Sequence, residues 1–140
     1  MFSVRHLGKY DVLQIVYISV ATRILSQDEL VTLCKLSVDN NRRDEITGFM
    51  LVKSGKYLQA IEGPKEVVED AFIRIIQDDR HNELLVLSRR LTSHREFGQW
   101  EMACYRNLRE HKKYVTRIAQ LTKLAPYPVQ KAFTDLLAAG

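Results

Sequence analysis

The sequence has little cysteine. Its 140 residues include two, Cys34 and Cys104, with no C-x-x-C spacing and no adjacent set of His and Cys residues. This pattern disfavours both a structural zinc site and a disulfide framework, which need more cysteines or closely spaced ligands. We expect two buried free thiols in a cytoplasmic protein, because free cysteine is among the most buried residue types.

Long hydrophobic runs are also lacking. The longest stretch without a charged residue, Val12–Thr22, contains Gln14 and Ser19 and is far shorter than the ~20 apolar residues of a membrane-spanning helix. Residues 1–9 have neither an apolar segment nor a small-residue cleavage site, so we expect no secretory leader. The composition, 46% hydrophobic and 27% charged, is that of a globular domain, and a chain of this length buries roughly two-thirds of its surface around one core.

Positive charge is concentrated at the C-terminal end. Residues 105–140 carry seven Lys or Arg against two Asp or Glu, whereas residues 1–104 carry 14 against 15. The basic segment also has apolar residues at helical spacing, which predicts an amphipathic helix that packs on the domain or on a partner. Nucleic-acid binding has less support, because no aromatic interleaving or nucleic-acid motif accompanies the charge.

Strand-like and helix-like segments alternate along the chain. Ser26 and Glu29 form a capping box that opens a helix ending near Asn40 or Asn41, and Ser54-Gly55 suits a tight hairpin turn. Gly63-Pro64 breaks a strand and starts a second helix, whose apolar stripe runs from Val67 to Ile76. The strands expected from β-branched and aromatic content are Val12–Ser19, Ile46–Lys53, Lys56–Glu62 and Leu84–Leu91, with a short fifth one at Trp100–Tyr105.

This order, β-α-β-β-α-β, predicts an α+β fold with a ferredoxin-like antiparallel sheet and two helices on one face. Pro126-Tyr127-Pro128 separates two further helices, expected over roughly residues 107–124 and 129–138. The fold hosts many functions and decides none of them.

Two asparagines lie at the end of the first predicted helix. On a helical wheel drawn from Leu30, Asn41 falls at about 20°, on the apolar face, and Asn40 at about −80°, toward solvent. The Asn41 amide matches a donor–acceptor edge such as the imide of a flavin or uracil ring. The alternative is an Asn that caps the helix C-terminus.

Polar side chains also occur on the predicted sheet and second helix. Strand alternation places Gln59 and Tyr57 on one face of their strand and groups Tyr17 with the apolar residues of the first strand, so that Tyr17 and Gln59 could meet beneath the helices. The alternative is a pair of incidental, satisfied polar groups in a core. Arg74, Asp78 and His81 align along one flank of the second predicted helix. A cationic flank that borders a pocket suits a phosphate or a carbonyl oxygen. The alternative is a flank that is simply solvated.

Enzyme motifs are missing. The sequence has no phosphate-binding loop, dinucleotide fingerprint, H-E-x-x-H or G-x-S-x-G, and neither His81 nor His94 lies near a Ser or Cys in a nucleophile motif. From the residues alone, the sequence predicts a ligand-binding α+β domain.

Six spaced motifs resemble one family. They are Val16-Tyr17-Ile18-Ser19, Asn40-Asn41, Ile46-Thr47-Gly48, Leu58-Gln59-Ala60-Ile61-Glu62-Gly63, Asp78-Asp79-Arg80-His81, and Phe97 with Trp100-Glu101-Met102. In this order, over roughly residues 12–105, they closely resemble the BLUF family, sensors of blue light using FAD. Glu45 stands where a Gly is common in the family, and this departure removes no photoactive residue.

The resemblance implies FAD, with FMN as the alternative, held noncovalently between the two helices over the sheet. Asn41 would hold the flavin C4 carbonyl and N3–H, with Asn40 beside the ring or the phosphate end. Arg80 would contact the C2 carbonyl. The ribityl–phosphate side would be lined by Arg74 and His81, and Asp78 is counted with these cofactor-binding residues.

The resemblance also implies a photoactive pair, Tyr17 and Gln59. In the family's mechanism, Tyr17 gives an electron and a proton to the excited flavin, Gln59 rearranges by rotation or tautomerisation, and recombination leaves oxidised flavin with a reversible red-shifted absorption band. Trp100 and Met102 look like the pair that responds to Gln59 and passes the signal to the sheet edge, unless they are purely structural.

The expected organisation is an N-terminal extension over 1–11, a BLUF flavin-binding domain over 12–105 and a helical tail over 106–140. No cyclase, phosphodiesterase or DNA-binding effector is expected in the chain, so the resemblance is to short, non-enzymatic BLUF proteins that signal to an unidentified partner protein or through a homo-oligomer. Deletion of 107–140 is expected to preserve photochemistry and abolish partner binding. The remaining alternatives are a small ferredoxin-like enzyme and a non-photoactive small-ligand or nucleic-acid binding module.

Overall fold

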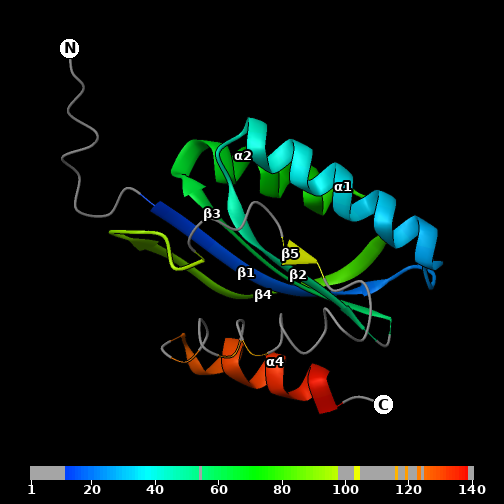
Figure 1. The fold of residues 1–140 in the computed structure, drawn as a ribbon. Coiled ribbons are helices and arrows are strands. Elements are labelled where there is room, and N and C mark those ends of the chain that lie inside the picture. The colour runs from blue at the N-terminus through cyan, green and yellow to red at the C-terminus, as the bar shows by residue number, and fades with distance from the viewer. Residues whose placement is uncertain are drawn as a thin grey trace.

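The computed structural model describes residues 12–53, 55–97, 103–104 and 125–138, with single positions at 116, 119 and 123. Helices α1 (Gln27–Arg43) and α2 (Lys65–Ile76) cover one face of a five-stranded sheet, and α4 (Tyr127–Ala138) covers the other (Figure 1). The sheet has the order β4-β1-β3-β2-β5. Its strands are β1 (Val12–Ala21), β2 (Thr47–Lys53), β3 (Lys56–Pro64), β4 (His81–Thr92) and β5 (Ala103–Cys104).

The predicted α+β order and ferredoxin-like sheet are confirmed. The four long strands pair antiparallel, whereas β5 pairs parallel with β2, so the sheet is not antiparallel throughout. β1, β3 and β4 extend beyond their predicted ends, and Gly63-Pro64 belongs to β3 rather than breaking it. Trp100 and Met102 lie outside the described residues, as does all of the helix expected over 107–124 except the single positions 116, 119 and 123.

The predicted capping box opens α1. The Ser26 hydroxyl accepts from the Glu29 backbone N–H at 3.1 Å, and the Glu29 carboxylate accepts from the Ser26 N–H at 2.9 Å. The helix continues past the predicted end to Arg43, and Asp44 is its C-cap. Asn41 is therefore an interior residue of the last helical turns, and its interpretation as a cap is wrong.

The β2–β3 hairpin turns between Lys53 and Lys56, which pair with each other. Gly55 has φ 74°, a left-handed conformation that glycine adopts without strain. Gly48 serves a different purpose, because a Cβ there would lie 1.9 Å from the Ala60 carbonyl oxygen. A side chain at residue 48 is incompatible with this close approach of β2 to β3.

Each face of the sheet has its own core. Under α1 and α2, the buried cluster contains Leu13, Ile15, Cys34, Ile46, Met50, Tyr57, Ile61, Val68 and Ala71. Under α4, it contains Val16, Phe49, Leu51, Leu58, Ala60, Phe97, Val129, Phe133 and Leu136. Because side chains alternate along a strand, β1 and β3 contribute to both clusters in turn, as predicted for Tyr57 and Ile61.

A buried carboxylate anchors the loop that follows β4. Glu62 is fully buried and accepts hydrogen bonds from Gln14 Nε2 (3.2 Å), Thr47 Oγ1 (3.0 Å), and the backbone N–H groups of Glu96 (2.9 Å) and Phe97 (2.7 Å). Burial raises the pKa of Glu62, and these donors act in the opposite direction. The carboxylate ties residues 96 and 97 to the end of β3.

We expect Glu62→Gln to lower the free energy of unfolding by about 1–3 kcal/mol, because the amide directs N–H groups at donors that now face a carboxylate oxygen. Urea denaturation of the purified protein measures this change. The matched control is Glu69→Gln, at a half-exposed ion pair with Arg89, where we expect about 0–1 kcal/mol. Equal effects at the two positions would contradict the anchoring role.

The expectation of two free buried thiols is wrong. Cys34 is 4% exposed and is disulfide-bonded. The other cysteine of the chain, Cys104, is in β5, which lies beside α1. Cys34 and Cys104 are far apart in the sequence, and their spacing alone does not indicate that the fold brings α1 and β5 together.

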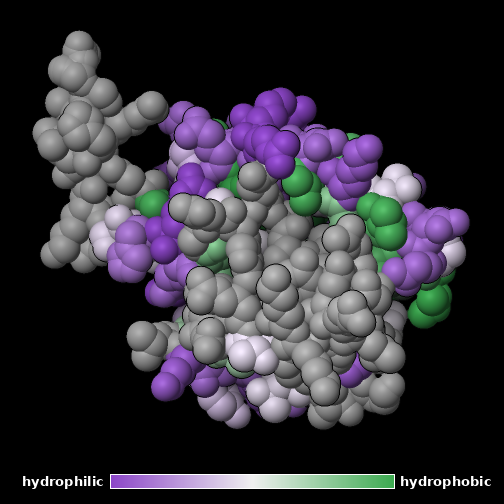
Figure 2. All heavy atoms as spheres, in the orientation of Figure 1, coloured by the Kyte–Doolittle hydropathy of each residue, from purple (hydrophilic) through white to green (hydrophobic). Residues whose placement is uncertain are grey.

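The outer surface of the α1/α2 layer is largely hydrophilic, with separate hydrophobic side chains on it (Figure 2). None of the helices in the described part of the chain is both long and apolar enough to cross a bilayer.

Candidate functional site

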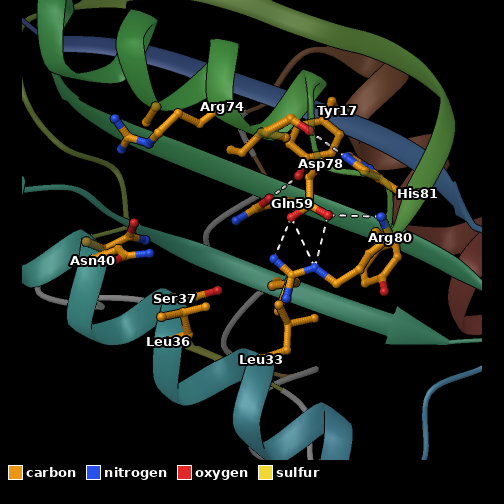
Figure 3. Close-up of a pocket in the computed structure, with 15 residues that line it drawn as sticks. Tyr17, Leu33, Leu36, Ser37, Asn40, Gln59, Arg74, Asp78, Arg80 and His81 are labelled. Carbon is orange, nitrogen blue, oxygen red and sulfur yellow. Dashed lines mark hydrogen bonds and ion pairs between the residues drawn. The ribbon is translucent and has the colours of Figure 1, made fainter.

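A cavity of ≈ 250 Å³ lies between α1 and α2, above the face of the sheet that they cover (Figure 3). This volume lies just below the ~300–1,000 Å³ of typical small-molecule sites, which suits a ring system held inside with the rest of the ligand outside. Residues from both helices, four strands and the segment after α2 line it: Tyr17, Leu33, Leu36, Ser37, Asn40, Asn41, Met50, Tyr57, Gln59, Ala71, Arg74, Ile75, Asp78, Arg80 and His81.

Tyr17 and Gln59 meet in the wall of this cavity, as predicted. They are direct partners in the antiparallel register of β1 and β3, and the Tyr17 hydroxyl donates a hydrogen bond to Gln59 Oε1. Both are buried, with 3% and 7% of their surface exposed. A phenol and a carboxamide are thus joined by one proton at the edge of the ligand space.

Burial holds the pKa of Tyr17 well above its usual value, and the negative charge of Asp78 and the nearby Tyr57 act in the same direction. The phenol therefore keeps its proton at physiological pH. Aromatic rings surround it: the centroids of Phe72 and His81 lie 5.8 and 6.0 Å from that of Tyr17. The environment preserves Tyr17 as a neutral donor toward Gln59.

Asn40 and Asn41 both line the cavity. The wheel correctly turned Asn41 inward, but its placement of Asn40 toward solvent is wrong, because Asn40 is half-buried beside the cavity (Figure 3). The cavity lies along the flank of the α1 apolar stripe, where Leu36 and Ser37 also line it, and not over its centre. The Asn41 Nδ2 group is buried and has no hydrogen-bond partner among the described residues.

Arg80 is held by Asp78. Its Nε lies 3.0 and 3.1 Å from the two Asp78 carboxylate oxygens, its Nη2 lies 2.5 Å from Oδ2, and its backbone N–H donates to Oδ1 at 2.9 Å. The hydrogen bonds from Arg80 keep the pKa of Asp78 below its usual range. The pair presents a fixed guanidinium at the cavity, suited to a carbonyl or phosphate oxygen.

His81 has both ring nitrogens occupied. Its Nε2 lies 2.7 Å from the Ile75 carbonyl, which can only accept, so Nε2 carries the proton; its Nδ1 lies 2.7 Å from Ser19 Oγ. The ring thereby connects the end of α2 to β1 and β4. His81 lines the cavity, and both of its ring nitrogens are already paired with protein atoms, Ser19 Oγ and the Ile75 carbonyl.

Arg74 lines the cavity from α2, and its guanidinium Nη2 donates to Asp44 Oδ2 at 3.0 Å. The pair joins α2 to the C-cap of α1. Arg74, Asp78 and His81, the residues of the predicted flank, all line the cavity.

Sequence reasoning did not assign Ser37 and Tyr57 to the site. The sequence pattern could have indicated both residues, since Ser37 lies on the same side of α1 as Asn41, and Tyr57 lies on the same strand face as Gln59. The partners of His81 could not be found this way, because they come from other elements.

The donors of this cavity fit a flavin. Of the buried side-chain polar atoms in the described residues, two have no partner, Asn41 Nδ2 and the Tyr57 hydroxyl, and both belong to cavity-lining residues. Buried polar groups are rarely left unpaired, so unpaired donors at a cavity indicate a ligand with acceptors. A flavin ring and its ribityl chain carry such oxygens.

The fold and cavity define a ligand-binding α+β domain, and the model of one family, BLUF, sensors of blue light using FAD, matches residues 12–103. The chain therefore belongs to the BLUF family, blue-light sensors whose cofactor is FAD. The predicted family resemblance is confirmed.

Known relatives agree with this assignment. Photoactivated adenylate cyclase subunit beta of Euglena gracilis is 35% identical over 82 residues, covering 59% of this chain and 10% of that protein. Subunit alpha is 30% identical over 91 residues, covering 65% and 9%. The chain spans about a tenth of the length of these curated relatives.

Solved structures share the fold. A bacterial light-regulated adenylyl cyclase matches with a TM-score of 0.65 and 31% identity, over 81% of this chain and 35% of that one. BlrB, a BLUF protein in its dark state, matches with a TM-score of 0.70 and 24% identity, over 91% and 94%. The second match covers nearly the whole of both chains.

Proposed function

We propose that this chain senses blue light through Tyr17 and Gln59 and relays the resulting change to a partner protein. One observation supports the proposal above the others: the Tyr17 hydroxyl donates a hydrogen bond to Gln59 Oε1 at the wall of a cavity that fits the family's cofactor. The register of β1 and β3 fixes this pair from the backbone.

When bound, FAD supplies blue-light absorption and a site that accepts an electron. With the cofactor bound, Tyr17 would be the residue that gives up an electron from its phenol, and its proton would pass first to the Gln59 carbonyl oxygen, which already accepts its hydrogen bond. The Gln59 amide would exchange its donor and acceptor ends, by rotation or tautomerisation. Return of the electron and the proton to Tyr17 would close the cycle without a co-reactant and would leave a changed set of hydrogen bonds around Gln59.

The other cavity residues hold the cofactor in this proposal. Asn41 supplies an amide donor that has no partner within the described ranges, with Asn40 beside it. Arg80 presents its guanidinium, fixed by Asp78, and Arg74 and His81 complete the rim. Trp100 and Met102 are proposed to respond to Gln59.

The proposed organisation is an extension over 1–11, a sensor over 12–105 and a tail over 106–140. The sensor carries out no turnover of its own, and its output passes to a partner. Named relatives are light-regulated cyclases, in which a sensor accompanies an enzyme. The proposed compartment is the cytoplasm.

A visible absorption spectrum tests the proposal. The purified chain, reconstituted with FAD, is measured after dark adaptation, under blue light and again in darkness. We expect a flavin band that moves to longer wavelength in the light and returns in the dark. A chain that cannot take up FAD, or a bound flavin that only bleaches by reduction, would reject the photocycle and favour a non-photoactive binding module or a flavoenzyme.

A further inference from the structure

Tyr57 is a cavity residue that the proposed photochemistry does not use. It lies on β3, two residues before Gln59 and on the same face, and it pairs with Ser19 of β1. The side chain lines the cavity and is 5% exposed. Its position brings a second phenol into the ligand space.

The Tyr57 hydroxyl is buried and has no hydrogen-bond partner among the described residues. Its neighbours in the cavity are paired: Tyr17 donates to Gln59, and both nitrogens of His81 are occupied. An unpaired buried hydroxyl is unfavourable and is retained where a ligand or an ordered water pairs with it. Tyr57 lines a cavity of ≈ 250 Å³, which has room for a ligand group beside the hydroxyl.

Tyr57 lines the cavity together with Arg80 and His81. Its ring meets that of His81 edge-on, with centroids 5.9 Å apart and an interplanar angle of 82°. Burial raises the pKa of the Tyr57 phenol. The positive charge of Arg80 lowers this pKa, the negative charge of Asp78 raises it, and the positive charge of Arg23 lowers it. The phenol stays protonated and can donate.

We propose that the Tyr57 hydroxyl donates a hydrogen bond to an oxygen of the bound flavin on the Arg80 side of the cavity. Flavins offer two kinds of acceptor oxygen, the ring carbonyls and the hydroxyls of the ribityl chain. This inference rests on the proposed function, because it assigns a further binding residue to the same site.

The test is Tyr57→Phe, which removes one oxygen and keeps the ring. We expect the Kd for FAD, titrated by quenching of flavin fluorescence in darkness, to rise about three- to ten-fold, as for the loss of one neutral hydrogen bond. We expect the melting temperature of the flavin-free chain to stay the same or rise, because no residue in the described part of the chain pairs with the hydroxyl. A purely structural role would instead lower that melting temperature and leave the Kd unchanged.

A ligand pair identifies the acceptor. Riboflavin has the ribityl hydroxyls, and lumiflavin carries a methyl group in their place. Weaker binding of both by Tyr57→Phe supports a bond to a ring carbonyl, and weaker binding of riboflavin alone supports a ribityl oxygen. Unchanged binding of both overturns the proposal.

The matched control is Tyr127→Phe, on α4, where the side chain is 71% exposed and lies outside the cavity. Its Kd should equal that of the parent chain. If the parent chain takes up no flavin, the proposed function itself fails. If it binds flavin and responds to light while Tyr57→Phe binds FAD equally well, only the assignment of Tyr57 is wrong.

Discussion

Tyr17→Phe should abolish the reversible light-induced red shift while FAD stays bound. The substitution removes the one proton that the side chain directs at Gln59, and it preserves the ring that packs against Phe72 and His81. Gln59→Leu should have the same effect, because leucine fills similar space without an amide. Difference spectra recorded before and after blue light measure the shift, and the dark spectrum reports the bound flavin.

The control for the first substitution is Tyr127→Phe, an identical chemical change at an exposed residue of α4. It should retain the full shift and the same recovery in darkness. A shift of parental size in both Tyr17→Phe and Gln59→Leu would refute the roles given to this pair, although the chain would remain a flavin-binding member of its family.

Phe133→Ala should lower the free energy of unfolding by about 3–5 kcal/mol, the range for truncating a large aromatic side chain in a core. Phe133 is 5% exposed and belongs to the cluster that joins α4 to the sheet, together with Phe49 and Leu58. The cavity created there lies on the sheet face opposite the flavin site. Urea denaturation of the flavin-loaded chain in darkness gives the difference.

The neighbouring exposed position, Thr134, provides the control for this prediction. Thr134→Ala should change stability by no more than about 0.5 kcal/mol, because surface substitutions have small effects. If Phe133→Ala were equally mild, α4 would not be part of the core. The same packing bears on the deletion of residues 107–140, because this deletion would uncover Leu51 and Leu58 as well as remove the segment that we propose to bind a partner.

Local features of the fold were predictable from the sequence. The capping box of Ser26 and Glu29 and the turn at Gly55 depend on neighbouring residues and were found as expected. The shared face of Tyr17 and Gln59 followed from strand alternation. Their direct pairing did not, because the register between strands that are not consecutive depends on the packed sheet.

The remaining differences come from long-range packing. The inward position of Asn40 depends on where the cavity lies relative to α1, and the disulfide of Cys34 depends on which elements α1 passes. The parallel pairing of β5 likewise reflects the path of the chain after β4. Local patterns of polar and apolar residues do not specify which distant elements pack together.

β3 acts as a partition with a different environment on each side. Gln59 faces the cavity, while its neighbours in the chain, Leu58 and Ala60, lie in the cluster that α4 closes. Any displacement of the backbone at residue 59 must move these two residues as well, since they are bonded to it. A structural change at Gln59 therefore needs to cross only one strand, β3, to reach the residues that pack against α4 on the opposite face of the sheet.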